Sequence, residues 1–225
     1  MIKPAYPHPP IAREGWPYVA AVFALALATT LLWSLAAGLV FWLLGVVVLL
    51  CLRDPARLAP DSTQAVLSPA DGRVVAVETV RDEHVGREAL RISVFVGLFA
   101  SPACRAPVSG TVQSAEPLPG AFVNARQSHA SSDNSRHVLQ IDTAQGQRVT
   151  CVLVAGALAR NVQCYARAGE PLARGQRCGF TPLGSRVDLY LPVTARPRVA
   201  LGDRVSATST VLADLTAVLE RPQSF

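Results

Sequence analysis

The chain has 225 residues, of which 50% are hydrophobic, and it carries a formal net charge of +5. This length suffices for one ordinary soluble domain together with a membrane segment. Lys3 is the only lysine. This argues against functions that need a lysine in a folded domain, such as holding pyridoxal phosphate or carrying biotin or lipoate. The five cysteines and four histidines show no CxxC, HxxxH or HExxH spacing. We therefore predict no metal site, and unpaired cysteines fit a reducing compartment.

The first long feature is an apolar stretch, residues 16–52, without a single charged residue. As one helix it would be about 55 Å long, against roughly 30 Å for the core of a bilayer. Two short helices with a break near Ser34 to Gly38 fit better, so we predict a transmembrane or membrane-inserted helical hairpin. The stretch is too long for a cleaved signal peptide. Basic residues on both sides predict that both ends face the cytoplasm, which places the following domain on the cytoplasmic side of the cell membrane. These residues are Lys3, Arg13, Arg53 and Arg57.

The remaining sequence divides into a short tail, a linker and one β-rich domain. Residues 1–15 form the tail, the polar segment 53–64 reads as the linker, and 65–225 form the domain. Apolar runs of four to eight residues, rich in β-branched side chains and separated by turn residues, predict strands. The clearest runs are 73–80, 89–96, 137–143, 148–156, 186–192 and 210–215.

Two weak internal repeats lie within this domain. "SPADGRV" (68–74) is similar to "APVSGTV" (106–112), and "AGEPLARGQRCG" (168–179) is similar to "LGDRVSATSTVL" (201–212). In each copy a glycine turn leads into a strand. Paired elements of this kind predict a mainly β fold of the barrel-sandwich type found in lipoyl and biotinyl carriers.

A set of longer blocks follows the apolar stretch in a fixed order. They read "LRDPAR", "SPADGRVVAV", "CRAPVSGTV", "PGAFVNA" and "VAGALARNVQCYARAGEPLARGQRCGFTPLGSRVDLYLP". In this order the chain resembles the short form of phosphatidylserine decarboxylase over nearly its whole length. The last block is long and specific, whereas the others are individually weak but correctly spaced. Members of that family are proenzymes that cut themselves at a Gly-Ser bond and turn the serine into an N-terminal pyruvoyl group.

The resemblance implies a cut between Gly184 and Ser185. The large chain 1–184 and the small chain 185–225 would then stay together as a heterodimer. The implied activity is that of a carboxy-lyase, which converts phosphatidylserine in the membrane to phosphatidylethanolamine. A nucleic-acid partner is not expected. The residues agree with this chemistry, because a serine hydroxyl can attack the preceding carbonyl and glycine leaves that carbonyl open. A ketone would then replace the lysine-bound cofactor that this chain lacks.

Asp71 in "SPADG" matches the family's motif aspartate, which by resemblance supports the base that activates the serine. On its own, Asp-Gly is a common turn. The family usually has "HVNRAP" where this chain has "PACRAP", so Pro102 occupies the histidine position and Cys104 replaces the asparagine. Three explanations remain open. His137 or His129 substitutes for the missing histidine, Asp71 acts slowly with water, or the chain is a degraded relative. Such a relative would be an uncleaved, membrane-bound lipid-binding or structural protein.

The implied substrate carries a phosphate and a carboxylate, which arginine binds through paired hydrogen bonds. Arg105, Arg160 and Arg186 lie in the family-like blocks and are candidates, with ordinary solvated arginines as the alternative reading. The apolar run 94–100 could line an acyl-chain groove or form a core strand. A lipoyl-type carrier or a membrane adaptor is a further alternative. The missing lysine argues against the carrier, and the absence of coiled-coil heptads argues against the adaptor.

Overall fold

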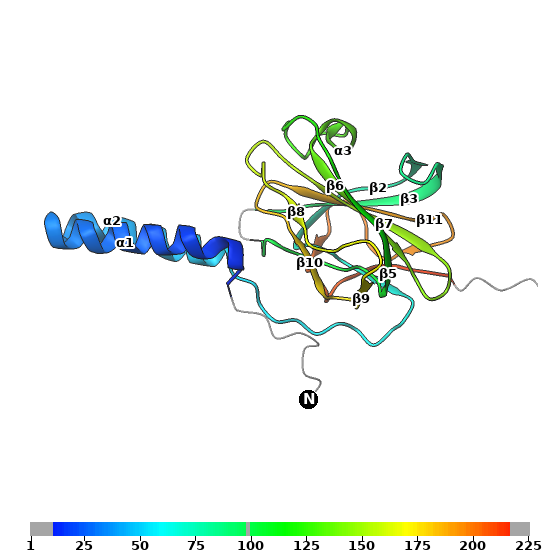
Figure 1. Ribbon diagram of the computed structural model, residues 1–225, viewed down its shortest axis with the longest axis horizontal. Coiled ribbons are helices and arrows are strands. Elements are labelled where there is room, and N and C mark those ends of the chain that lie inside the picture. Colours follow the sequence, from blue (N-terminus) through cyan, green and yellow to red (C-terminus); the bar gives the residue numbers. More distant parts are fainter. Residues whose placement is uncertain (1–10, 98–99, 217–225) are drawn as a thin grey trace, which may run out of the picture.

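The computed structural model describes residues 11–97 and 100–216, so most of the expected N-terminal tail lies outside the described residues. A helical hairpin projects from one end of a β domain (Figure 1). After a short 3-10 turn, η1 (Arg13–Gly15), the hairpin consists of α1 (Trp16–Leu32) and α2 (Leu35–Cys51). The helix break therefore lies at the start of the range that the sequence predicted. Ser34 caps α2, because its hydroxyl accepts a hydrogen bond from the Ala37 N–H at 3.2 Å.

Small residues let the two helices of the hairpin pack closely. A Cβ atom on Gly38 would overlap the side chain of Thr30, and one on Gly45 would lie 3.1 Å from the ring of Phe23. The Phe23 ring also meets Trp42 edge to face, with ring centroids 5.5 Å apart. The span Arg13–Leu32 is long and apolar enough to cross a membrane, whereas α2 is shorter, with 17 residues. The structure therefore confirms two packed apolar helices at the predicted place, and their insertion into a membrane stays a prediction.

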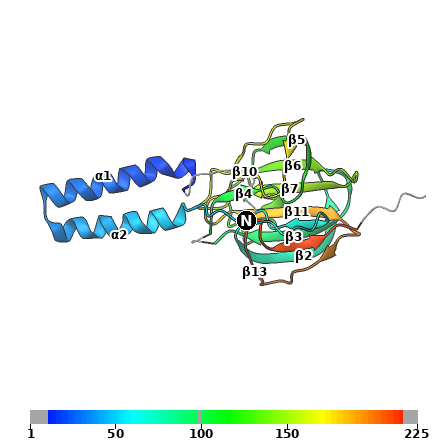
Figure 2. The same cartoon turned by 90° about the horizontal axis from the view of Figure 1, so that it is seen from below.

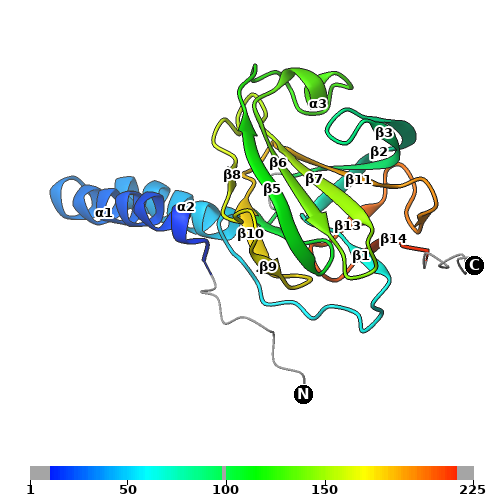
Figure 3. The ribbon, with the colours of Figure 1, turned by 45° about the vertical axis from the view of Figure 1, so that its right-hand side comes forward.

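The β domain is built around one curled antiparallel sheet of eight strands, in the order β13-β2-β3-β11-β7-β6-β5-β9. Two small sheets, β1-β14-β12 and β4-β10-β8, pack with it (Figures 2 and 3). This arrangement confirms a mainly β fold, and the six predicted runs correspond to β2, β3, β6, β7, β11 and β14. The strands are β1 (Ala65–Leu67), β2 (Gly72–Asp82), β3 (Arg87–Phe95), β4 (Ala103–Arg105), β5 (Gly110–Leu118), β6 (Arg136–Asp142), β7 (Arg148–Val154), β8 (Gln163–Cys164), β9 (Pro171–Leu172), β10 (Arg177–Phe180), β11 (Arg186–Pro192), β12 (Arg196–Pro197), β13 (Arg204–Val205) and β14 (Val211–Asp214); a single helical turn, α3 (Ala130–Asp133), precedes β6.

One hydrophobic core joins the three sheets. Ile92 and Leu189 of the large sheet are fully buried together with Leu212 of β14 and Cys104 of β4. Strand side chains alternate between the two faces of a sheet, so the small sheets cover the inner face of the curled sheet. All five cysteines are free thiols.

The large sheet has an internal two-fold relation, which explains the repeats in the sequence. When the strands are counted inwards from the two edges of the sheet, β13 corresponds to β9, β2 to β5, β3 to β6 and β11 to β7. Gly72 and Gly110 begin corresponding strands, and a Cβ atom on either would overlap a backbone carbonyl of the neighbouring strand. Both strand pairs also contain an irregularity in register two residues after the glycine. The repeated turns thus lead into equivalent strands of a duplicated half-barrel.

Candidate active site

The Gly-Ser pair lies in a tight turn between β10 and β11. The backbone N–H of Ser185 donates to the Pro182 carbonyl at 3.2 Å, and the Ser185 hydroxyl donates to the same oxygen at 2.5 Å. Gly184 has a φ of +79°, as the third residue of a type II turn requires. Ser185 is fully buried. Gly184 therefore has a backbone conformation that residues with a side chain rarely adopt.

The other half of the sheet contains a copy of this turn. There, Gly146 has a φ of +73° and precedes Gln147 and Arg148, the first residue of β7. Gly146 donates its N–H to the Thr143 carbonyl, and the Thr143 N–H donates to the Gln147 carbonyl.

The Gly-Ser turn makes the same two bonds with Val96. The Gly184 N–H donates to the Val96 carbonyl, and the Val96 N–H donates to the Ser185 carbonyl. The backbone of the Gly-Ser turn is thus that of an ordinary strand connection. Any special reactivity must come from what surrounds it.

Asp71 lies at the start of β2 and is held by three partners. Its carboxylate accepts hydrogen bonds from both terminal nitrogens of Arg57, one of them at 2.6 Å. It also accepts hydrogen bonds from the backbone N–H groups of Ala207 at 2.7 Å and Ser101 at 3.1 Å. Burial favours the neutral acid, but these hydrogen bonds and the charge of Arg57 outweigh it and hold the pKa of Asp71 below its usual value. The carboxylate is therefore ionised at neutral pH.

Asp71 and Ser185 are not in direct contact. Arg73, two residues after Asp71, and Arg186, directly after Ser185, both pair with Phe95 of β3, from opposite sides. Strand β3 therefore separates the two sites, and their backbones are about 10 Å apart. The segment 101–102 connects them. The backbone N–H of Ser101 donates to Asp71, and the Pro102 carbonyl accepts the Thr181 N–H at 2.7 Å, just before the Gly-Ser turn. Pro102 thus lies between the two predicted site residues.

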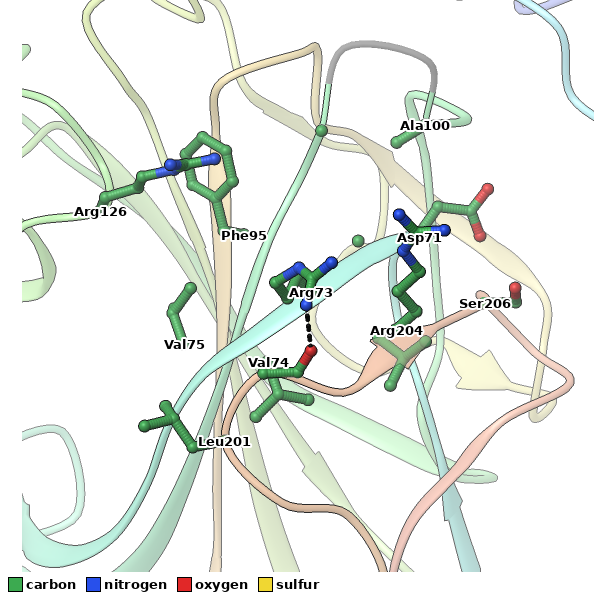
Figure 4. A pocket seen from close by; sticks show the side chains of 14 residues that line it. Asp71, Arg73, Val74, Val75, Phe95, Ala100, Arg126, Leu201, Arg204 and Ser206 are labelled. Carbon is green, nitrogen blue, oxygen red and sulfur yellow. Dashed lines mark hydrogen bonds between the residues drawn. The ribbon is translucent and has the colours of Figure 1, made fainter.

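A pocket of about 920 Å³ opens beside Asp71. Arg73, Arg126 and Arg204 line it, and all three are exposed (Figure 4). The guanidinium of Arg126 lies 4.5 Å from the ring centroid of Phe95, the β3 residue opposite Arg186. The pocket is therefore a cationic cavity beside β3, the neighbour of the strand that follows the Gly-Ser turn. These arginines were not among the residues predicted from the sequence, although Arg73 and Arg204 both lie in the repeated glycine motifs.

This chain matches the family model for phosphatidylserine decarboxylase over residues 44–213. The chain belongs to the phosphatidylserine decarboxylase family. A relative from Ralstonia nicotianae is 56% identical over 214 residues, which cover 93% of this chain and 98% of the relative. Another, from Paraburkholderia xenovorans, is 52% identical over 210 residues, covering 93% and 99%. Both are named phosphatidylserine decarboxylase proenzyme. The resemblance found in the sequence is confirmed.

The two histidines considered as replacements for the family histidine lie away from the turn. His137 is on β6, opposite Leu153, which in turn is opposite Val187, so it is two strands, or about 10 Å, from β11. Burial lowers the pKa of His137. His129 is exposed and directly precedes α3. Within the described residues, neither histidine forms a hydrogen bond with Ser185 or Asp71.

Two of the three arginines proposed for substrate binding have structural roles instead. Arg105 is buried and forms an ion pair with Asp54 at 2.7 Å. Arg186 is also buried, pairs with Asp188 at 2.6 Å and donates to backbone carbonyls of the loop before α3. Arg160 is exposed, with its guanidinium 5.8 Å from the ring centroid of Phe122. In this family member the pocket arginines are therefore better candidates for binding an anion.

Replacing Arg57 with glutamine should raise the pKa of Asp71, because burial would no longer be opposed by a nearby positive charge. The depressed pKa stabilises the fold above the pKa of the unfolded carboxyl, and this stability is lost as pH falls through the folded value. We expect acid unfolding of R57Q to begin at a higher pH than in the wild type. R57K keeps the positive charge, so its acid unfolding should begin close to the pH at which the wild type unfolds. The measurement is the melting temperature between pH 3 and pH 7.

The matched control is R148Q, which breaks the ion pair with Asp142 in the other half of the sheet. This ion pair is more exposed than the one between Arg57 and Asp71. Its loss should therefore shift the pH at which acid unfolding begins by less than the loss of Arg57 does. An R57Q profile that coincides with that of the wild type would contradict the assigned role of Arg57.

Proposed function

We propose that this chain is a pyruvoyl-dependent decarboxylase that cuts itself between Gly184 and Ser185 and converts phosphatidylserine to phosphatidylethanolamine. The observation that carries the proposal is a buried Gly-Ser turn one strand away from a cationic pocket, in a chain of the phosphatidylserine decarboxylase family. The enzyme would work at the cell membrane, with its β domain on the cytoplasmic side.

The proposed self-cleavage uses only atoms of this turn. The Ser185 hydroxyl oxygen attacks the Gly184 carbonyl carbon, the peptide C–N bond breaks, and the freed nitrogen takes up the hydroxyl proton, which leaves an ester. Loss of the α-proton of residue 185 then expels the Gly184 carboxylate and leaves dehydroalanine. After tautomerisation, water displaces ammonia and a ketone remains. That ketone supplies a covalent attachment point for the substrate amine and accepts the electron pair left by departing CO₂.

The fold supports a heterodimer that persists after the cut. Strand β11 belongs to the small chain 185–225 and lies between β3 and β7 of the large chain. Leu189, Leu191 and Val187 on this strand are fully buried in the common core. Separating the two chains would expose this surface to water and leave strand hydrogen bonds unmade, so they should remain associated.

The position of the hairpin supports action on a membrane lipid. The hairpin leaves the domain at the end where β4, β8 and β10 lie (Figures 1 and 2), and β10 leads directly into the scissile turn. Glu14 at its start pairs with Arg177 of β10 at 2.7 Å, and Asp54 at its end pairs with Arg105 of β4. These contacts hold the scissile end of the domain close to the hairpin base. The basic excess would add roughly 1 kcal/mol per arginine near an anionic leaflet.

The proposed ligand of the cationic pocket is the substrate head group. Substituting both Arg126 and Arg204 with alanine should raise KM for phosphatidylserine by about 10-fold or more, since each removes a charge-assisted hydrogen bond. Self-cleavage should be unaffected, because among the described residues neither side chain forms a hydrogen bond or ion pair with the Gly-Ser turn. Substitution of Arg167, an exposed arginine outside the pocket, serves as the control. Unchanged KM in the double variant would place the head group elsewhere.

Intact mass measurement of the purified protein tests the proposed function. We expect fragments 1–184 and 185–225, the smaller without a free N-terminal amine, and release of CO₂ from phosphatidylserine vesicles. Pro102 at the family's histidine position is the sequence argument for the alternative of an uncleaved lipid-binding or structural protein, and neither the fold nor the relatives support that alternative. A single mass of the whole chain, without CO₂ release, would support that alternative.

A further inference from the structure

Gly156 lies against the peptide bond that the proposed function requires to break. A Cβ atom built on Gly156 would overlap the Gly184 carbonyl oxygen and lie 3.0 Å from the Gly184 carbonyl carbon. The same atom would lie 3.4 Å from the Cβ of Ala125. Side-chain atoms do not approach a backbone carbonyl this closely, so only glycine fits between the scissile carbonyl and the loop before α3.

The backbone around Gly156 is held from several directions. Its own N–H donates to the Ala159 carbonyl at 3.1 Å, and the Ala155 N–H donates to the Ser135 carbonyl at 2.9 Å. The side-chain amide of Asn134, which is fully buried, donates to the Ala155 carbonyl at 2.7 Å. A side chain at position 156 therefore could not be accommodated by moving this loop, and the scissile peptide would have to shift instead.

The copied turn provides an internal comparison. The Gly146 and Gly184 turns share two backbone hydrogen bonds, to Thr143 and Val96 respectively, and have similar φ values. A Cβ atom on Gly146 would meet nothing within 4 Å, whereas one on Gly184 would lie 3.6 Å from the Cβ of Leu158. The segment 156–158 thus covers the Gly-Ser turn on a side where its copy is open.

We propose that Gly156 is a positioning residue for self-cleavage, which holds the Gly184 carbonyl where the Ser185 hydroxyl can attack it. This inference rests on the proposed cut at Gly184–Ser185. Attack requires the oxygen and the carbonyl carbon to meet in a narrow range of distance and angle, and a misplacement of about 1 Å can cost 10²-fold in rate. Contact with the α-carbon of Gly156 fixes the plane of the scissile peptide within that range.

The test compares G156A with G110A. G110A introduces a matched clash, because a Cβ atom on Gly110 would overlap the Asp142 carbonyl oxygen and lie 2.9 Å from the carbonyl carbon, in the half of the sheet without the Gly-Ser turn. Both variants should lose thermal stability, but only G156A should cut about 10²-fold or more slowly. The measurements are the melting temperature and the appearance of the 185–225 fragment over time. Equal cutting by the two variants would overturn the proposal.

Hydroxylamine separates the stages of the reaction, because it cleaves an ester already formed at Ser185. It should not release the fragment from G156A if the acyl shift itself is blocked, and its release would overturn the proposal.

Q147S is an independent test that does not depend on G156A folding. It places a Gly-Ser-Arg sequence in the copied turn, where none of the described glycines packs against the Gly146 carbonyl as Gly156 packs against that of Gly184. We expect no cut between residues 146 and 147, and a cut there would overturn the proposal. An uncut wild-type chain would refute the proposed function itself.

Discussion

Replacing Ser185 with alanine should leave one uncut chain that releases no CO₂. Alanine has no oxygen to attack the Gly184 carbonyl and no group that can be converted to a ketone, so both activities should be lost completely. The fold should persist, because the hydroxyl donates its hydrogen bond to the Pro182 carbonyl, and loss of one neutral hydrogen bond costs about 1 kcal/mol. Intact mass and CO₂ release from phosphatidylserine vesicles are the measurements.

Ser128→Ala is the control for this substitution. Ser128 is exposed and precedes α3, so the variant should cut and decarboxylate like the wild type. The decisive comparison is between two chains that differ at one hydroxyl each. If S185A still yielded a fragment beginning at residue 185, or still released CO₂, the serine could not be the source of the ketone.

The sequence predicted the architecture well because the signals for it are local. Alternating apolar runs between turn residues marked β2, β3, β6, β7, β11 and β14, and the absence of charge over 16–52 marked the hairpin. The echo around Gly72 and Gly110 predicted a duplicated β fold, and both glycines do begin equivalent strands. One repeat was missed. Gly184-Ser185-Arg186-Val187 follows Gly146-Gln147-Arg148-Val149 at the same spacing as the two glycines of the first echo, and this pattern is visible in the sequence.

The candidate site was predicted less completely, because its contacts depend on how distant segments meet. Arg105 and Arg186 read as possible anion ligands, but the fold buries each beside a carboxylate. Arg57 lay in a segment read as a linker, and only the folded β domain brings its guanidinium to Asp71. Gly156 gave no signal at all, since its importance comes from a carbonyl that is close in space and distant in sequence. Which residues contact each other depends on the register of the strands, and the composition of the sequence does not contain that information.

The internal repeat separates two roles of Asp71. In the other half of the sheet, Ser109 occupies the equivalent position before Gly110, and its hydroxyl accepts a hydrogen bond from the Arg174 N–H at 3.0 Å. Asp71 makes the corresponding bond to the Ala207 N–H. Turn capping therefore needs only a small polar side chain. The bonds to Arg57 and to the Ser101 N–H are additional. We propose that these additional bonds make Asp71 a positioning residue, which holds segment 101–102 against the start of the scissile turn.

Asp71→Ser should accordingly preserve the cap while slowing self-cleavage by about 10²-fold, within the range expected when a catalytic array loses one well-placed charged group. D71N retains an acceptor oxygen without the charge and should fall between D71S and the wild type. The reciprocal variant S109A should lower the melting temperature, because it removes a turn cap, but should cut at the wild-type rate. The rate of fragment formation, set against the melting temperature, distinguishes these outcomes. If D71S cut as fast as the wild type, Asp71 would be a turn cap like Ser109, and the activation of Ser185 would have to be sought among other groups.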